Sequence, residues 1–451
     1  MGALRKRVFT ALLAVIMPAC FAGCMRIAAE DLYSLPQLSE QYLRLQGHIN
    51  AVLNSGAEFS PPTGGPNRQS VQMKDLNGNG VDEVIAFFSV PGEGVLRILI
   101  FEMVDGDYTV ACVIEGFGTT IDSVRYASMN GGGFMQIIVG WEMSAGLKNM
   151  SIYAIDDFES VWLTGAEFSS LTVFDMNGDG FDDVIVLRPP MQESGAVAEV
   201  FSLAQDGTIS RAETRLSGGI EAISRVLTGY LIDGVPAIFV ESEGKFLKGS
   251  LVTDICTYRD GLFSNISCVG PGGVSEATVR PRTPRVHSSD INKDGVIKVP
   301  MPWLMRAQSE TEYYAIDWYG YSSGGSSRLL LTTYNNDFDE WYLTLPFDWR
   351  GNVSVRREDA VSGERTVVFS YIAGEDEPFE DFLKIYKLSG DKAAERVALP
   401  GRILLKEEGA AIYAFELLAE PNSFGLTFDE SVISRNFKLI YSDWLSAGQP
   451  E

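Results

Sequence analysis

Three short loops in this chain carry carboxylate and amide oxygens at alternate positions and close on a glycine. They are Asp75–Glu83, Asp175–Asp183 and Asp290–Lys298, and each leads into a short apolar run. Alternate side chains in a tight loop can converge on one centre, and glycine permits the positive φ that such a turn needs. Hard divalent cations with flexible coordination, chiefly Ca²⁺, prefer a shell of carboxylate and carbonyl oxygens. The pattern therefore predicts calcium-binding loops.

These loops differ from EF-hands in two respects. An EF-hand places a bidentate glutamate at loop position twelve, whereas the three loops have Ala86, Val186 and Met301 there. The residues that follow each loop also favour a strand rather than a helix, which excludes a dockerin-like helix pair. The remaining alternative is a set of Asx-rich hairpin turns that need no metal.

The glycines that close the loops recur at a spacing near fifty residues. They are 53, 47, 54 and 61 residues apart, and two of them belong to weaker copies of the loop: Gly80, Gly133, Gly180, Gly234 and Gly295. Each unit between them offers three or four strand-like runs. A fixed period of this length indicates a repeat architecture, and four antiparallel strands repeated radially form a propeller blade.

The sequence therefore predicts a mainly β protein, a β-propeller of about five to seven four-stranded blades. A pair of β-sandwiches and a β-helix are the alternatives. Sandwich domains would not repeat their loop chemistry at one offset, and a β-helix coil is usually shorter than this repeat. Neighbouring blades would stack because one blade cannot cover its own apolar faces.

The third unit, D-M-N-G-D-G-F-D-D-V-I-V from Asp175, resembles the repeats of integrin-alpha-type propellers, the FG-GAP or VCBS-like class. The resemblance extends over about 270 residues of the chain. In that family, side-chain oxygens at loop positions one, three, five and nine bind calcium together with the backbone carbonyl at position seven. The resemblance thus implies these metal ligands: Asp175, Asn177, Asp179, Asp183 and the Phe181 carbonyl; Asp75, Asn77, Asn79, Glu83 and the Val81 carbonyl; Asp290, Asn292, Asp294 and the Val296 carbonyl.

The Asp290 loop departs from the family pattern, because Lys298 occupies its ninth position. An ammonium group there removes a ligand and adds a repelling charge. The charged side chains at these positions sum to −3 in the Asp175 loop, −2 in the Asp75 loop and −1 in the Asp290 loop. We expect calcium affinity to fall in that order, within the ~10⁻⁴ to 10⁻³ M range of extracellular modules.

The N-terminus is typical of an export signal. Basic residues 5–7 precede the apolar run Val8–Met17, whose ten residues would rise ~15 Å as a helix, short of a ~30 Å hydrocarbon core. Phe21–Gly23 followed by Cys24 resembles the bacterial lipobox, in which the cysteine is lipidated. We expect residues 1–23 to be a signal peptide and Cys24 to anchor the chain at the outer face of the cell membrane. An ordinary signal peptidase site is the alternative.

Three further regions are expected after the signal. Residues 24–68 would form a lipid-anchored helical segment and linker, with the helix at about 31–53. Residues 69–344 would form the propeller. The loop motif then disappears, and residues 345–451 would form a small C-terminal α+β domain that ends in a capped helix at Asp429–Arg435 and a last strand.

The charge, cysteine and histidine content of the chain argue against some classes of partner and of catalytic site. The formal net charge of −24 repels nucleic-acid phosphates and anionic headgroups, so nucleic acid is not an expected partner. Cys256 and Cys268 flank a turn and could pair outside the cell, whereas Cys112 is expected to be buried. Two histidines, His48 and His287, leave almost nothing for a Ser-His-Asp arrangement, and His287 is expected to be structural.

These features favour a calcium-stabilised, non-catalytic binding or adhesion scaffold for an extracellular protein or polysaccharide. One alternative is a carbohydrate-active hydrolase or lyase, because glycosidases need only two carboxyl groups about 5–9.5 Å apart. The other is a structural protein of envelope assembly. The residues that line the centre of the propeller would discriminate among them.

Overall fold

The computed structural model describes residues 40–440, except 91, 93, 157–158, 191–194, 245–249, 260, 269–272, 282, 308–309 and 375–377. The predicted signal peptide and Cys24 lie outside the described residues. The chain divides into two compact units, Met1–Ala57 with Met103–Thr109, and Glu58–Glu102 with Val110–Glu451. None of the described helices is long and apolar enough to cross a membrane.

The first unit contains helix α2, Glu40–Asn54, which is the described part of the expected helical segment. Within this unit Arg44 contacts the turn at residues 106–107. Its Nε lies 3.2 Å from Asp107 Oδ1, and its Nη2 donates to the Gly106 carbonyl over 2.8 Å. The helix is thereby joined to a turn that lies some sixty residues further along the chain.

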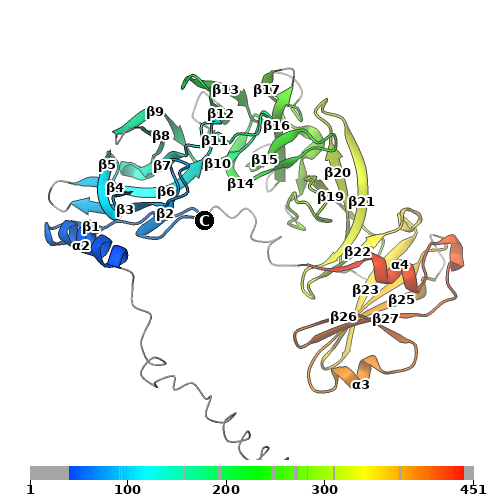
Figure 1. The fold of residues 1–451 in the computed structure, drawn as a ribbon. Helices are drawn as coiled ribbons and strands as arrows, with labels where there is room; N and C mark the ends of the chain where they lie inside the picture. Colours follow the sequence, from blue (N-terminus) through cyan, green and yellow to red (C-terminus); the bar gives the residue numbers. More distant parts are fainter. Residues whose placement is uncertain are drawn as a thin grey trace, which may run out of the picture. The chain divides into compact units, whose positions relative to one another are not determined.

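Four antiparallel sheets follow one another from residue 58 to residue 281 (Figure 1). The first contains β1 Glu58–Phe59, β2 Val71–Lys74, β3 Glu83–Val90, β4 Val95–Val104 and β5 Asp107–Gly116; the second contains β6 Thr120–Ala127, β7 Gln136–Glu142, β8 Lys148–Asp156 and β9 Glu159–Phe168; the third contains β10 Ser170–Phe174, β11 Asp183–Arg188, β12 Val197–Leu203 and β13 Ile209–Arg215; the fourth contains β14 Ile220–Tyr230, β15 Pro236–Gly244, β16 Ser250–Arg259, β17 Leu262–Asn265 and β18 Arg280–Pro281.

Two further sheets follow in the described part of the chain. The fifth contains β19 Val299–Leu304, β20 Tyr314–Tyr321, β21 Ser327–Asn336, β22 Trp341–Leu345 and β28 Phe437–Leu439; the sixth contains β23 Val353–Val361, β24 Glu364–Tyr371, β25 Glu380–Leu388, β27 Ala411–Leu417 and β26 Arg402–Glu408. The short helices are η1 Ser144–Gly146, η2 Glu276–Thr278, η3 Phe347–Trp349, α3 Ala393–Val397, η4 Ser423–Gly425 and α4 Glu430–Asn436.

The apolar runs of β3, β7 and β11, each of which follows a loop, are buried on both faces. In β7, Ile137 and Val139 pack into a core cluster shared with the first sheet, whereas Ile138 packs into one shared with the third. In β11, Val186 belongs to the cluster shared with the second sheet and Ile185 to the one shared with the fourth. Successive side chains of a strand point to opposite faces, so a continuous apolar run serves two neighbours at once.

The same kind of packing joins each sheet to the next along the chain. The cluster around Phe239 and Val299 links the fourth and fifth sheets, and the one around Trp341 and Phe369 links the fifth and sixth. Consecutive antiparallel sheets of four or five strands, stacked through shared cores, are built in the manner of propeller blades. The predicted mainly β fold is confirmed.

The last described strand pairs with an earlier sheet. After α4, which is capped by the Asp429 side chain accepting from Val432 N over 2.8 Å, β28 pairs with β22 of the fifth sheet. The capped helix was predicted from the sequence, whereas this pairing was not.

No disulfide forms among the three described cysteines, Cys112, Cys256 and Cys268. Cys112 is buried in β5, as expected, and burial raises the pKa of its thiol to about 11. Cys256 is buried in β16, and the disulfide considered for Cys256 and Cys268 is not formed.

Candidate functional site

The three intact loops connect to the sheets in one register. In each, the residue just before the loop pairs with the residue at loop position nine: Lys74 with Glu83, Phe174 with Asp183, and Ser289 with Lys298. The first two loops join β2 to β3 and β10 to β11. The third loop lies between the two residues of an isolated antiparallel bridge, Ser289 and Lys298, and β19 begins at the next residue. The repeat seen in the sequence is therefore a repeat of hairpin geometry.

The aspartate at position one folds each loop by accepting backbone N–H groups from later positions. The donors and distances are Gly78 and Gly80, both 2.8 Å, for Asp75; Gly178, 2.8 Å, and Gly180, 3.0 Å, for Asp175; Asp294, 3.0 Å, and Gly295, 2.7 Å, for Asp290. The bonds run to N–H groups three to five residues further along the chain. They hold one carboxylate of each loop at a fixed place.

The side chain at position five is fixed in the same way, because it accepts the N–H of position seven. The pairs are Asn79 with Val81 at 2.7 Å, Asp179 with Phe181 at 2.9 Å, and Asp294 with Val296 at 2.9 Å. At position three, Asn77 and Asn177 accept from the N–H of position five at 3.0 and 2.8 Å. Positions one, three and five thus present their oxygens in equivalent places in the first two intact loops.

The carboxylates at position nine are buried. Glu83 and Asp183 are 4% and 2% exposed and accept from the backbone N–H of Leu76 and Met176 over 2.7 and 2.9 Å. Burial is the main reason that the pKa of Glu83 is raised and that the pKa of Asp183 is raised to about 6. The amide of Asn77 also donates to Glu83 and, over 3.2 Å, to Glu102, a further carboxylate at the first loop.

In the Asp290 loop, the ammonium group of Lys298 lies among the oxygens of the loop. The Nζ of Lys298 is 3.3 Å from Asp290 Oδ1, 2.6 Å from Asp294 Oδ1 and 2.8 Å from the Val296 carbonyl oxygen. Positions one, five and seven therefore surround a single cation site in this hairpin. Burial alone would raise the pKa of Asp294, but the hydrogen bonds from Lys298, the Val296 N–H and Asn292, together with the charge of Lys298, outweigh it and lower that pKa to about 2.

The Asp290 loop shows where a cation lies in this type of hairpin, so the other two loops can be compared with it. They carry oxygens at the same positions in the same register, and they have a carboxylate in place of the lysine. Such donors match the preference of Ca²⁺ for carboxylate, amide and backbone oxygens. Among the described residues no group of three or more His, Cys, Asp and Glu side chains could hold a metal ion; the loops combine carboxylates with amide and carbonyl oxygens.

The weaker loop at residues 128–136 keeps part of this construction. Gln136 takes the ninth position and accepts from Met129 N over 2.9 Å, as Glu83 and Asp183 do from the equivalent residues. Sequence reasoning missed Gln136, because the carboxylates that mark the other loops are absent here. Gln136 could have been recognised from its place eight residues after Ser128, together with the apolar Met129 at position two, which is buried.

Consecutive loops contact one another. Met135 N donates to the Leu76 carbonyl over 2.7 Å, and Asp182 N donates to the Ser128 carbonyl over 2.9 Å. A Cβ atom on Gly78 would lie 2.5 Å from the Gly133 carbonyl oxygen, so only glycine permits this approach. Ordering of one loop is thereby linked to the position of the next sheet.

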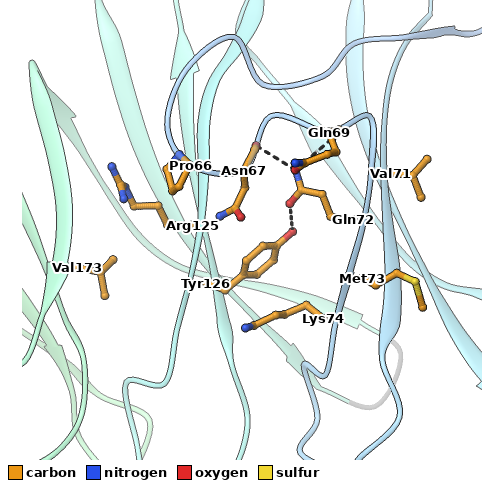
Figure 2. Close-up of a pocket in the computed structure, with 10 residues that line it drawn as sticks. All are labelled: Pro66, Asn67, Gln69, Val71, Gln72, Met73, Lys74, Arg125, Tyr126 and Val173. Carbon is orange, nitrogen blue, oxygen red and sulfur yellow. Dashed lines mark hydrogen bonds between the residues drawn. The ribbon is translucent and has the colours of Figure 1, made fainter. Parts of the chain in front are cut away.

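A pocket of about 470 Å³ lies beside these loops (Figure 2). Three consecutive sheets contribute to it through β2, β6 and β10, the strand that precedes the loop in each sheet. Met73, Tyr126 and Val173 stand two residues before position one of their loops, so they are equivalent residues of the repeat. The lining consists of Pro66, Asn67, Gln69, Val71, Gln72, Met73, Lys74, Arg125, Tyr126 and Val173.

Hydrogen bonds hold one wall of the pocket in place. Figure 2 shows Tyr126 Oη donating to Gln72 Oε1, over 2.7 Å, while Gln72 Nε2 donates to the carbonyls of Asn67 and Gln69 over 3.0 and 3.1 Å. The Asn67 amide donates to the Val124 carbonyl over 3.1 Å. Since Gln72 is itself buried, this wall is formed before any ligand arrives.

The charged residues of the lining are both cations, Lys74 and Arg125. Within the described part of the chain, Arg125 Nε is buried without a hydrogen-bond partner. Burial is the main cause that lowers the pKa of the Arg125 guanidinium, against an opposing effect of Asp122. Neither residue was predicted from the sequence, because both are basic and lie in strands outside the loops.

Comparisons with known proteins leave the family open. No protein-family description matches the chain, and no curated protein matches it. Similar solved structures include one titled "Structure of Dos1 propeller", with a TM-score of 0.27 and 10% identity over 79% of this chain and 81% of that one. The fold assignment rests on the strand order and the shared cores described above.

Proposed function

We propose that this protein is an exported, lipid-anchored and non-catalytic binding scaffold. Its Asp75 and Asp175 loops would hold Ca²⁺, and its pocket at β2, β6 and β10 would bind a small anionic ligand. The pocket is the observation that carries the proposal, because three consecutive repeats contribute equivalent residues to one cavity. Its volume falls within the range of about 300–1,000 Å³ typical of small-molecule sites.

The charge of the lining supports an anion. The chain has 60 acidic and 36 basic residues, yet this pocket is lined by two cations and no carboxylate. A buried guanidinium N–H without an acceptor is unfavourable, and an oxyanion that accepted it would offset that cost. The planar guanidinium matches a carboxylate better than an ammonium group does.

The neutral residues of the lining suit a ligand that also carries hydroxyl groups. Asn67, Gln69 and Tyr126 offer amide and phenol groups, and the Tyr126 ring offers a flat apolar face. An acidic monosaccharide or disaccharide combines these properties. The hydrolase alternative needs a pair of carboxylates, and the lining of this pocket contains none.

The experiment is a calorimetric titration of the folded chain with galacturonate, with galactose 6-phosphate and with neutral galactose. We expect galacturonate to bind, the phosphate to bind more weakly, and galactose to give no heat. Arg125→Gln and Lys74→Gln should each weaken galacturonate at least about tenfold, as expected for the loss of a charged hydrogen bond of about 1.5–3 kcal/mol.

Lys406→Gln is the matched control, because it removes an exposed positive charge on β26 outside the pocket lining. This variant should bind galacturonate as the wild type does. Equal binding of galactose and galacturonate, or unchanged binding in both pocket variants, would refute the anion site.

A further inference from the structure

We infer that the Lys298 ammonium group is a built-in replacement for a metal ion, so that the Asp290 loop takes no Ca²⁺. The residues of this loop were expected from their family resemblance to bind the metal. In the folded chain the lysine side chain is 0% exposed and its Nζ contacts the oxygens at positions one, five and seven. Those are three of the positions at which the resembling family binds its cation.

The three loops share much of their hydrogen bonding, and the sign of the charge at the ninth residue differs among them. Position one accepts the same glycine N–H in all three, position five accepts the N–H of position seven, and position two is a buried apolar residue: Leu76, Met176 and Ile291 at 2%, 0% and 1% exposure. The residue before the loop also pairs with position nine in each. The loops thus share one frame, and they differ in having Glu83, Asp183 or Lys298 at its end.

Position nine decides the occupant because its side chain turns into the loop. A carboxylate there adds an oxygen ligand and raises the negative charge of the set, whereas the lysine places a positive charge at the centre. Lys298 donates to two carboxylates and one carbonyl, which matches the three N–H donors of an ammonium group. A calcium ion in the same place would be brought against a buried positive charge.

A tethered cation differs from a bound one in its response to solution conditions. An ion held with a dissociation constant of ~10⁻⁴ to 10⁻³ M is lost when free calcium falls. Lys298 is covalently attached and stays at any calcium concentration. The loop in front of the fifth sheet would therefore remain ordered in chelator, and any calcium dependence would reside in the loops of the first and third sheets.

The test is a count of bound Ca²⁺ by equilibrium dialysis, on wild type and on Lys298→Asp. The aspartate restores at position nine the carboxylate found in the Asp175 loop. We expect Lys298→Asp to bind one more Ca²⁺ per chain than the wild type, and to show a larger rise in melting temperature between chelator and calcium. Lys406→Asp, on exposed β26, is the control and should bind as the wild type does.

A folded Lys298→Asp variant that binds no more Ca²⁺ than the wild type would overturn the inference. Wild type that binds no Ca²⁺ at all, with one ion in the variant, would refute calcium binding at the Asp75 and Asp175 loops and leave this inference standing. The two proposals therefore fail separately.

A measurement on the wild type covers the case in which the variant does not fold. Amide hydrogen exchange at Gly295, whose N–H donates to Asp290 over 2.7 Å, should be the same in calcium and in chelator. Faster exchange of Gly295 in chelator would show that the loop depends on a metal, and it would overturn the inference as well.

Discussion

Arg280 and Glu241 form an ion pair in which Nη2 of the guanidinium lies 2.6 Å from Oε1 of the carboxylate, and neither side chain is exposed. Glu241, on β15, also accepts from Ser288 N over 2.6 Å and contacts His287 Nδ1 at 2.5 Å. The carboxylate thereby holds the segment that leads into the Asp290 loop against the fourth sheet. The same contact holds His287 against the fourth sheet.

This carboxylate predicts a defined acid sensitivity. Burial alone would raise the pKa of Glu241, but His287 and Arg280 outweigh it and lower the pKa from 4.5 to about 2. A lowered folded-state pKa gives stability that is present above pH 4.5 and lost as the pH falls toward 2. The loss amounts to about 3 kcal/mol at about 1.4 kcal/mol per pKa unit. Urea unfolding at several pH values between these limits measures it.

Glu241→Gln removes that titration and leaves Arg280 without its charge partner. We expect the variant to be about 3–5 kcal/mol less stable at pH 7, and its stability to fall less between pH 4.5 and 2 than that of the wild type. Glu159→Gln, an exposed change on β9, should keep the wild-type profile. An unchanged acid profile in Glu241→Gln would contradict the assignment.

Calcium is expected to raise the melting temperature through the Asp175 loop more than through the Asp75 loop. With a dissociation constant of ~10⁻⁴ M, about 10 mM Ca²⁺ stabilises by about 2.7 kcal/mol per site. Asp175→Ala also removes a turn bond, so the quantity to compare is the difference between calcium and chelator within each variant. That difference should mostly vanish in Asp175→Ala and shrink less in Asp75→Ala.

Asp206→Ala is the control for the turn bond. Asp206 accepts from Thr208 N over 3.0 Å in an exposed turn outside the loops, so its loss tests turn capping alone. The calcium difference should match that of the wild type. Identical melting curves of the wild type in calcium and in chelator would remove the basis for metal in these loops.

The sequence was sufficient for features that depend on local chemistry. The Asp and Gly spacing located three hairpins, and the apolar runs behind them located β3 and β11, because a strand buried on both faces must be apolar throughout. The cap at Asp429 was equally local. Each of these follows from residues within about ten positions of one another.

Features that depend on contacts between residues far apart in the sequence could not be predicted from local patterns. Nothing near residues 437–439 indicates that β28 joins β22, and Gln136 carries no charge to reveal its match with Glu83. The pocket required the register of three sheets before Lys74 and Arg125 could be placed in one cavity. Its signal was the repeat spacing of Met73, Tyr126 and Val173, which becomes informative only after the loops have been aligned.

The contact between Gly116 and Trp141 predicts a packing limit in the shared core of the first two sheets. A Cβ atom on Gly116 would lie 2.4 Å from the Trp141 ring, which is fully buried. Gly116→Ala should therefore cost about 1–3 kcal/mol in urea unfolding, as overpacking does. Gly47→Ala, in α2 with nothing within 4 Å of the new atom, should stabilise by up to about 1 kcal/mol. Equal effects of the two changes would contradict this packing.

The proposed export signal predicts that Cys24 carries a lipid. Cells that express the full chain should incorporate labelled palmitate into it, and the product should fractionate with membranes. Cys24→Ser should abolish the labelling, because it removes the thiol to which the lipid would be attached. Cys112→Ser, which alters a buried thiol on β5, is the matched control and should still be labelled. Undiminished labelling of Cys24→Ser would place the lipid elsewhere or rule out the anchor.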